Sequence, residues 1–318
     1  MKSKALIVTL VLLIAVTGLA AQKADIATPS PASIFHTAGV PLAKVINQKS
    51  GLQTTVMPFA GPAVYIPAVN AGEIPLGINN PYDLKLAMNG EDYYAGKKYT
   101  DIRAVAILFP VRNCIYVKKS SNLKTVADLK GHPMADGYNG QKVILPALDA
   151  IYATGGITRA DIKPVPVATV VAGADAFASG KVDAFFFSLG AAKVREVDAA
   201  VGGIRALQLD SSAKSLNELQ KVFPGGYLRL EKPGPENPGI VEPVYSLAYD
   251  AVVFASTKTP DDLVYRVVKT IYENKAELGA SFAPFNMIEQ REIAKRIPIP
   301  YHPGAIRFYQ EKGMWPPK

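Results

Sequence analysis

Short apolar runs alternate with amphipathic stretches along most of the chain. This alternation is typical of βα units that build a mostly parallel sheet. A strand is predicted near residues 23–28, followed by a helix whose apolar stripe is Leu42, Val45 and Ile46. Further extended segments are predicted at 53–59, 76–79, 103–108, 114–118, 133–136, 164–169, 183–187 and 245–256. Helices are predicted from Pro62 to Gly72, from Pro81 onward, and at 125–130, 141–154, 171–179, 260–274, 286–295 and 302–313.

The order of these elements predicts two lobes. At 318 residues the chain is long for one small domain, since domains average roughly 100–200 residues. The chain is expected to enter the second lobe near Pro110 and to return near Ala248, so that two crossing strands form a hinge over a cleft. We therefore expect a discontinuous first lobe of residues 22–110 plus 248–318, and a second lobe of residues 111–247.

The first 21 residues have the pattern of a cleavable secretory signal peptide. Lys2 and Lys4 precede an apolar run over 5–16, and small residues follow it. The run is shorter than the roughly 20 apolar residues that cross a bilayer, which leaves an uncleaved anchor as the weaker alternative. No cysteine follows the small residues, so a lipoprotein is not expected. We expect an exported protein of the periplasm.

Composition and net charge limit the classes of partner that the chain is expected to bind. The chain is 49% hydrophobic, which argues against disorder. Loss of Lys2 and Lys4 with the signal peptide would lower the formal charge from +8 to +6. A basic chain attracts anionic solutes, although the charge could equally reflect solvated surface. We expect a small anionic solute and no nucleic-acid partner.

The scarcity of reactive side chains argues against an enzyme. One cysteine, Cys114, excludes an intramolecular disulfide and a thiolate metal cluster, and it is interpreted as a core residue. Three histidines are present, and no paired carboxylates or nucleophile motif accompany them. His302, before Pro303, is interpreted as a helix cap. We therefore expect no catalytic residues, no metal and no cofactor.

Four segments resemble sequences of known families, two of them in a general way and two more specifically. The segment 123–131 (LKTVADLKG) and the segment 180–186 (GKVDAFF) resemble signatures of extracytoplasmic solute-binding proteins. The segments 96–106 (GKKYTDIRAVA) and 299–309 (IPYHPGAIRFY) are narrower, and both resemble the TAXI family. These proteins are the solute receptors of one branch of tripartite ATP-independent periplasmic (TRAP) transporters.

The resemblance implies a two-lobed α/β clamshell of the periplasmic-binding-protein type II class, with a mostly parallel sheet in each lobe. It implies a monomeric receptor that delivers a small organic acid anion to the permease subunits of a TRAP transporter. The anion would be a dicarboxylate, an oxo acid or a carboxylate-bearing amino acid. A receptor for an ABC importer, or a solute sensor on the same fold, is the alternative.

One segment departs from the family. The turn after the first strand, residues 28–37, holds two prolines and a histidine where TAXI receptors carry a glycine-rich turn. Prolines remove backbone donors and stiffen a loop. Side chains are therefore expected to supply more of the recognition, and the solute of a relative does not transfer to this chain.

Candidate ligand-binding residues follow from the strand ends. In open α/β lobes, ligands lie beyond the carboxyl ends of the strands, where helix N-termini offer free N–H groups. His36 could donate to a carboxylate or act as a cap or surface residue, and Arg112 could bind a carboxylate or form a salt bridge. Tyr249 could face the cleft or the core. The candidate residues are Ser33, Phe35, His36, Thr37, Gly61, Pro62, Asn79, Asn80, Tyr82, Arg112, Tyr138, Asn139, Gln141, Phe187, Ser188 and Tyr249.

Overall fold

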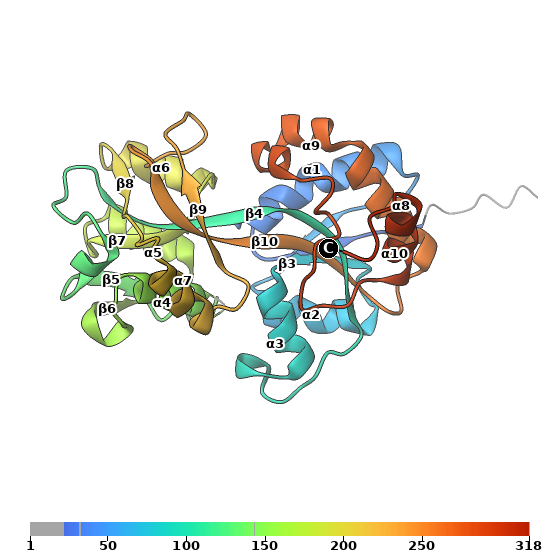
Figure 1. The fold of residues 1–318 in the computed structure, drawn as a ribbon, viewed down its shortest axis with the longest axis horizontal. Helices are drawn as coiled ribbons and strands as arrows, with labels where there is room; N and C mark the ends of the chain where they lie inside the picture. Colours follow the sequence, from blue (N-terminus) through green and yellow to red (C-terminus); the bar gives the residue numbers. More distant parts are fainter. Residues whose placement is uncertain (1–21, 32, 143, 318) are drawn as a thin grey trace, which may run out of the picture.

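The computed structural model of the chain describes residues 22–31, 33–142 and 144–317. Its elements form two groups that are joined by two long strands, β4 and β10 (Figure 1). The predicted signal peptide lies outside the described residues. Within those residues, no helix is both long enough and apolar enough to cross a bilayer.

The first group of elements combines the two ends of the described chain. Its strands are β1 (Ile26–Thr28), β2 (Val56–Pro58) and β3 (Leu76–Asn79), and β1 pairs parallel with both of the others. Proline at the first position and glycine just after the last residue delimit two of its helices, as predicted from Pro62 to Gly72 and from Pro81. The helices are α1 (Ile34–Lys49), α2 (Pro62–Ala71), α3 (Pro81–Asn89), η1 (Asp92–Tyr94), α8 (Asp261–Glu273), α9 (Lys275–Ser281), η4 (Ala283–Met287) and α10 (Pro303–Glu311).

The second group repeats the same construction. Its strands β5 (Pro133–Asp136), β6 (Lys163–Pro166) and β7 (Ala184–Ser188) pair parallel, with β5 in the middle. Short strands β8 (Ile204–Ala206) and β9 (Tyr227–Glu231) pair with the two long strands. The helices are η2 (Val126–Leu129), α4 (Ile144–Thr154), η3 (Arg159–Asp161), α5 (Val170–Ala178), α6 (Ala192–Ala200) and α7 (Ala213–Val222).

Strands β4 (Ile102–Lys118) and β10 (Val244–Ser256) run antiparallel through both groups and connect them. All strands therefore belong to one ten-stranded sheet. The prediction of two extended segments joined at Pro110 is wrong, because Pro110 lies inside the single strand β4. It pairs with Asp250, next to the register shift between Asp250 and Val252. Proline has no N–H for the sheet, so the ladder is weakest where the two groups meet.

The predicted helix over 286–295 is also wrong. A 3-10 turn, η4, and irregular turns occupy this region. The carbonyl of Ile293 accepts bonds from the N–H of Ile107 on β4 and from the hydroxyl of Tyr309, so tertiary partners replace the helical ones. His302 confirms its predicted capping role, because it is fully buried and its Nδ1 accepts from the N–H of Gly304.

Candidate ligand-binding site

A cavity of about 70 Å³ lies between the two groups of elements. Of the predicted candidates, those that line it are Ser33, Phe35, Pro62, Asn79, Asn80, Gln141, Phe187, Ser188 and Tyr249. Residues that were not predicted and also line it are Pro29, Ile34, Ile144, Val170 and Phe186. Pro29, Ile34, Ile144 and Phe186 lie within four residues of predicted candidates, whereas Val170 begins α5, at a strand end where no candidate was predicted.

The lining comes together because parallel strands end at the same edge of the sheet. Chain segments leave β1, β3, β5 and β7 toward the cavity and enter helices there. Ser33 caps α1 by accepting from the N–H of His36 at 3.1 Å, and Asn80 caps α3 by accepting from the N–H of Asp83 at 2.8 Å. Helix N-termini carry partial positive charge, so this edge favours an anion.

The two asparagines from the first group present their amide N–H groups rather than their oxygens. Asn79 Oδ1 accepts from the backbone N–H and the side-chain amide of Asn80, at 2.9 and 3.3 Å. Asn80 Oδ1 is occupied by the N–H of Asp83. An amide nitrogen carries two hydrogens, so each asparagine keeps a hydrogen beyond its internal bond. The pair therefore offers a ligand one hydrogen from each asparagine, against a single remaining lone pair on Asn80 Oδ1.

Gln141, from the second group, has the same arrangement. Its Oε1 accepts from the N–H of Val170, at the start of α5, at 2.9 Å, and neither hydrogen of its amide nitrogen is bonded to another residue that the structure describes. Ser188 differs, because its hydroxyl donates to Asn113 Oδ1 at 2.8 Å and can then only accept. The cavity thus has amide donors from both groups of elements.

A buried carboxylate fixes the asparagines. Asp83 is fully buried and accepts from Asn79 Nδ2 at 2.6 Å, from Tyr94 at 3.1 Å and from the hydroxyl of Tyr93. Burial raises the pKa of Asp83 to about 6, and the three donors lower it only in part. An ionised carboxylate can only accept, so it turns the amide nitrogen of Asn79 toward itself and the oxygen toward Asn80.

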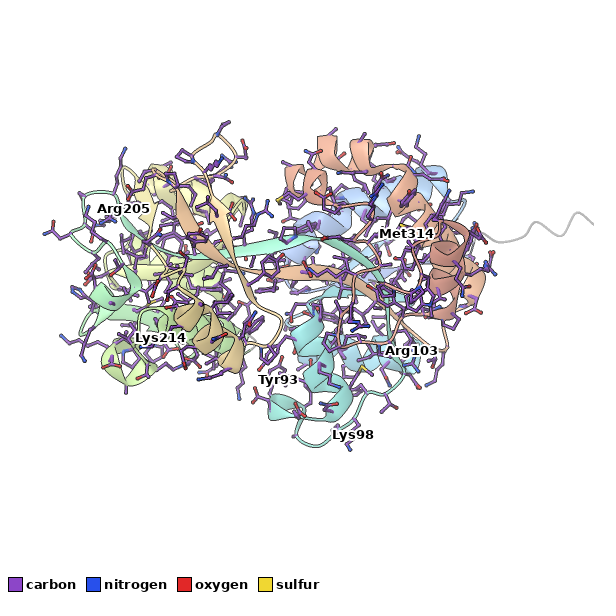
Figure 2. The ribbon with its side chains drawn as sticks, viewed as in Figure 1. Tyr93, Lys98, Arg103, Arg205, Lys214 and Met314 are labelled. Atoms are coloured by element: carbon purple, nitrogen blue, oxygen red, sulfur yellow. The ribbon has the colours of Figure 1, made fainter. Side chains whose placement is uncertain are left out.

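A second cavity of about 270 Å³ adjoins the first and shares Pro62 and Gln141 with it. The predicted residues Gly61 and Asn139 line it, as does Tyr93, on the side of α3 and η1 that faces the other group of elements (Figure 2). A Cβ at Gly61 would lie 3.3 Å from the carbonyl oxygen of Gly140. The two groups therefore touch at this pair of glycines.

The structure does not bring His36 and Thr37 to the cavity lining. His36 Nδ1 lies 2.9 Å from the hydroxyl of Thr28, and partial burial lowers the pKa of this histidine. Thr37 is exposed, and its hydroxyl donates to the carbonyl of Ser33. Both residues lie in the first turn of α1, on sides of the helix that do not line the cavity. Proximity to a helix start in the sequence was therefore not sufficient to place a side chain in the lining.

Tyr82 and Tyr138 also lie outside the lining. Tyr138 is fully buried, and its hydroxyl donates to the carbonyl of Ala135 within the second group. Tyr82 packs on Phe223, with ring centroids 4.4 Å apart, and Phe223 packs in turn on Tyr249. These three rings form a contact between α3, the segment after α7 and β10, in which Tyr249 lines the cavity and Tyr82 and Phe223 do not.

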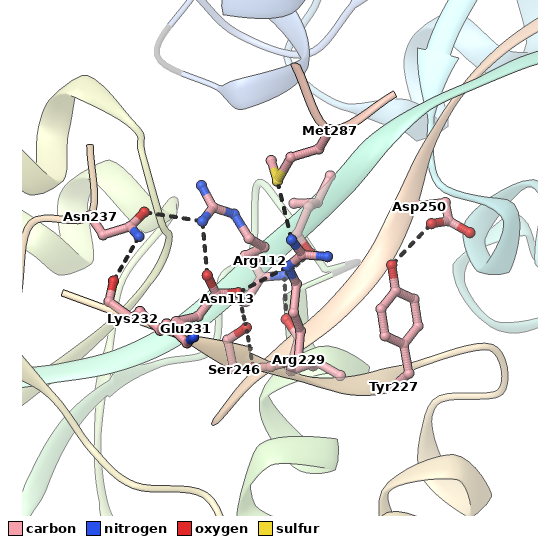
Figure 3. Close-up of polar contacts among 12 residues, drawn as sticks. Arg112, Asn113, Tyr227, Arg229, Glu231, Lys232, Asn237, Ser246, Asp250 and Met287 are labelled. Carbon is pink, nitrogen blue, oxygen red and sulfur yellow. Dashed lines mark hydrogen bonds and ion pairs between the residues drawn. The ribbon is translucent and has the colours of Figure 1, made fainter. Parts of the chain in front are cut away.

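Arg112 is occupied by a buried ion pair (Figure 3). Its guanidinium donates to Glu231 Oε2 at 2.9 Å and to Asn237 Oδ1 at 3.1 Å. The neighbouring Asn113 contacts the cavity residue Ser188, and successive side chains of a strand point to opposite faces. This alternation places Arg112 on the face away from the cavity, which the sequence pattern of β4 could have indicated.

No group of three or more metal-ligating side chains occurs among the residues that the structure describes. The lining residues of the cavity carry no nucleophile and base pair. What the arrangement can do chemically is hold a small acceptor by neutral donors and apolar contacts.

Known proteins place the chain in a family. The profile of the NMT1-like family matches residues 26–313. Among solved structures, MatC from Rhodopseudomonas palustris with bound malate has a TM-score of 0.58 at 12% identity, over 86% of this chain and 92% of that one. An ancestral arginine-binding protein bound to arginine has a TM-score of 0.53 at 15% identity, over 82% and 97%. A TctC solute binding protein from Polaromonas has a TM-score of 0.52 at 17% identity, over 84% and 89%.

These similarities confirm the predicted two-lobed α/β clamshell of the type II class. The solved structures that the chain resembles are a solute binding protein and two proteins with bound malate and bound arginine. The family match also agrees with the predicted resemblance to TAXI receptors. The chain belongs to the NMT1-like family and has the fold of the type II periplasmic solute-binding proteins.

Proposed function

We propose that the chain is an exported receptor that captures a small organic acid anion in the cavity between its two lobes. The observation that carries this proposal is the orientation of Asn79, Asn80 and Gln141, whose amide oxygens each accept from a protein N–H group, so that more hydrogens than lone pairs remain for a ligand. The amide hydrogens that remain suit an acceptor, and an anion is the strongest acceptor. The N-terminus of α1, which has no acidic residue in its first turn, adds to this preference, whereas Asp83 in the first turn of α3 offsets the dipole of that helix.

The binding site would use dipoles rather than side-chain charges. Among the described residues that line the cavity, none carries a formal charge. The chain as a whole is basic, which would concentrate anions near the molecule before they enter the cleft. The lobes would be residues 22–110 plus 248–318 and residues 111–247, in a monomer.

The solutes held by two solved structures agree with a carboxylate ligand. MatC holds malate, and the ancestral arginine-binding protein holds arginine, so both bind a carboxylate. At these low identities the likeness concerns the fold, and the solute of this chain follows from its own lining.

Calorimetry tests the proposal with a panel of dicarboxylates, oxo acids, amino acids and monocarboxylates. At least one should bind, and Gln141→Leu should weaken it at least tenfold, a loss of about 1.4 kcal/mol. Thr37→Ala is the matched control, because this exposed residue lies at the same edge and contacts only the carbonyl of Ser33. Equal affinity in wild type and Gln141→Leu would remove the site from the cavity and contradict the proposal.

We also propose that the receptor delivers its solute to the permease subunits of a TRAP transporter from the periplasm. The support is the TAXI-like pattern of segments 96–106 and 299–309. Uptake by cells that carry the chain should stop with an ionophore and continue when arsenate depletes ATP. The reverse would favour the alternative, an ABC importer. Recovery of a chain without its first 21 residues from the periplasmic fraction would support export, and an intact chain in the membrane fraction would contradict it.

A further inference from the structure

Building on the proposed function, we infer that the solute is a short-chain monocarboxylate with an uncharged, apolar body. Three kinds of side chain line the cavity and determine which ligand it can hold: amide donors, hydroxyls and apolar side chains.

The cavity can compensate one negative charge but not two. Its donors are neutral amides and hydroxyls, and the described lining holds no arginine, lysine or histidine. The Ser188 hydroxyl already donates to Asn113, so its exposed lone pairs would repel a second carboxylate. Removing an unpaired carboxylate from water carries a penalty of several kcal/mol. A dicarboxylate would suffer this penalty at its second end.

The cavity also lacks partners for an ammonium group. Asn79 Oδ1 already accepts two bonds, Asn80 Oδ1 and Gln141 Oε1 each keep one lone pair of a neutral oxygen, and the described lining contains no carboxylate to neutralise a positive charge. Asp83 lies behind Asn79, fully buried, with its oxygens bound to Asn79, Tyr93 and Tyr94. An amino acid would therefore place its ammonium against neutral oxygens such as those of Ser33 and Ser188, with no carboxylate to neutralise it, which makes a zwitterion a poor ligand.

The remaining wall favours hydrocarbon of limited size. Its apolar residues come from both lobes and include Ile34, Phe35, Ile144, Val170 and Phe187. A dry cavity of about 150 Å³ accommodates benzene. The cavity of this chain, at about 70 Å³, has about half that volume, so it limits the apolar body beyond the carboxylate to about three carbon atoms.

A matched four-carbon series tests the inference by calorimetry on the mature chain. The ligands are butyrate, succinate, 2-aminobutyrate and butyramide, which share a skeleton and differ by a second carboxylate, an added ammonium or the loss of charge. We expect butyrate to bind, and each of the other three to bind at least tenfold more weakly. Gln141→Leu should weaken butyrate at least tenfold, and Thr37→Ala should leave it unchanged.

The outcomes separate this inference from the proposed function. Succinate or 2-aminobutyrate binding as tightly as butyrate would overturn the monocarboxylate inference and leave the anion receptor intact. Butyramide binding as tightly as butyrate would overturn the anion receptor itself. Binding of none of the four would also overturn the inference, while the wider panel would still decide the receptor. Butyrate binding that Gln141→Leu does not change would place the ligand elsewhere and count against both.

Discussion

The two faces of the β4–β10 hinge use polar groups in opposite ways. On one face, Tyr249 lines the cavity together with neutral amides. On the other face, the next residue of β10, Asp250, lines a groove with Arg229, Lys295 and Glu292. Here full charges neutralise one another, with Lys295 at 2.5 Å from Asp250 and Arg112 paired with Glu231.

This difference separates the groups that hold the fold from those that select the solute. Paired charges can stabilise the hinge, but their field is largely cancelled and offers little to a ligand. Unpaired amide hydrogens contribute little to the fold beyond their internal bonds and remain available to bind. Substitutions on the two faces should therefore affect different measurements.

The largest effect is expected from Glu231→Ala on the charged face. It leaves Arg112, 7% exposed, without its carboxylate, and breaking a buried pair from one side lowers the free energy of unfolding by about 3–5 kcal/mol. Denaturant unfolding measures the loss. Adding Arg112→Met should restore most of it, because no buried charge then remains. A large loss of butyrate affinity with unchanged stability would contradict the division between the two faces.

The next effect is expected from Gln141→Glu on the neutral face. A carboxylate here replaces two hydrogen-bond donors with an acceptor and a negative charge. We expect anion affinity to fall about a hundredfold, or about 2.7 kcal/mol, by calorimetry. Gln48→Glu, which adds the same charge on the exposed side of α1, is the control and should change affinity less than twofold. Equal losses in both variants would mean that overall charge, and not the cavity, governs binding.

Lowering the pH should stabilise the chain through protonation of Asp83. Its pKa is raised from 3.8 to about 6, mainly by burial and to a smaller extent by Asp92. The folded chain therefore binds a proton more readily than the unfolded chain. As the pH rises from about 4 to 6, ionisation of Asp83 lowers the free energy of unfolding. Lowering the pH from 6 to 5 should raise the free energy of unfolding by about 1 kcal/mol relative to Asp83→Asn. Parallel pH profiles of wild type and variant would contradict this.

The smallest effect is expected where the lobes meet through Phe223. Its ring packs on Tyr82 and Tyr249 at centroid distances of 4.4 and 5.3 Å. Phe223→Leu keeps an apolar group and removes these ring pairs, each typically about 0.5–1.5 kcal/mol, which should weaken butyrate about fivefold. Phe177→Leu, whose ring packs on Phe185 within the second lobe, should lower stability and spare affinity. If both variants lose affinity equally, the contact between lobes has no special role.

The fold was largely predictable from the sequence, because periodicity and helix caps are local signals. Gly72 and Pro81 delimit their helices as predicted. The segment 286–295 was not predictable, because its carbonyl at Ile293 is satisfied by residues distant in sequence, Ile107 and Tyr309.

The site was predictable as a set of strand ends and less so as individual side chains. Chain direction brings Asn79, Gln141 and Ser188 to one edge of the sheet, whatever their neighbours do. The position of the Arg112 side chain depends on which face of β4 it occupies. The position of the Tyr138 side chain depends on whether its ring is buried in the core. Which atom of an amide faces the ligand depends on partners such as Asp83 and Val170, and nothing in the local sequence specifies them.

The contact between Gly61 and Gly140 has a consequence for the lifetime of the bound state. The cavity is lined from both groups of elements, so separating them at these glycines would uncover a solute held there. The dissociation rate would then rise with the rate at which the two groups separate. A side chain at Gly61 would meet the Gly140 carbonyl, act as a wedge and shorten the residence time. A permease that separates the lobes on binding would release the solute in the same way.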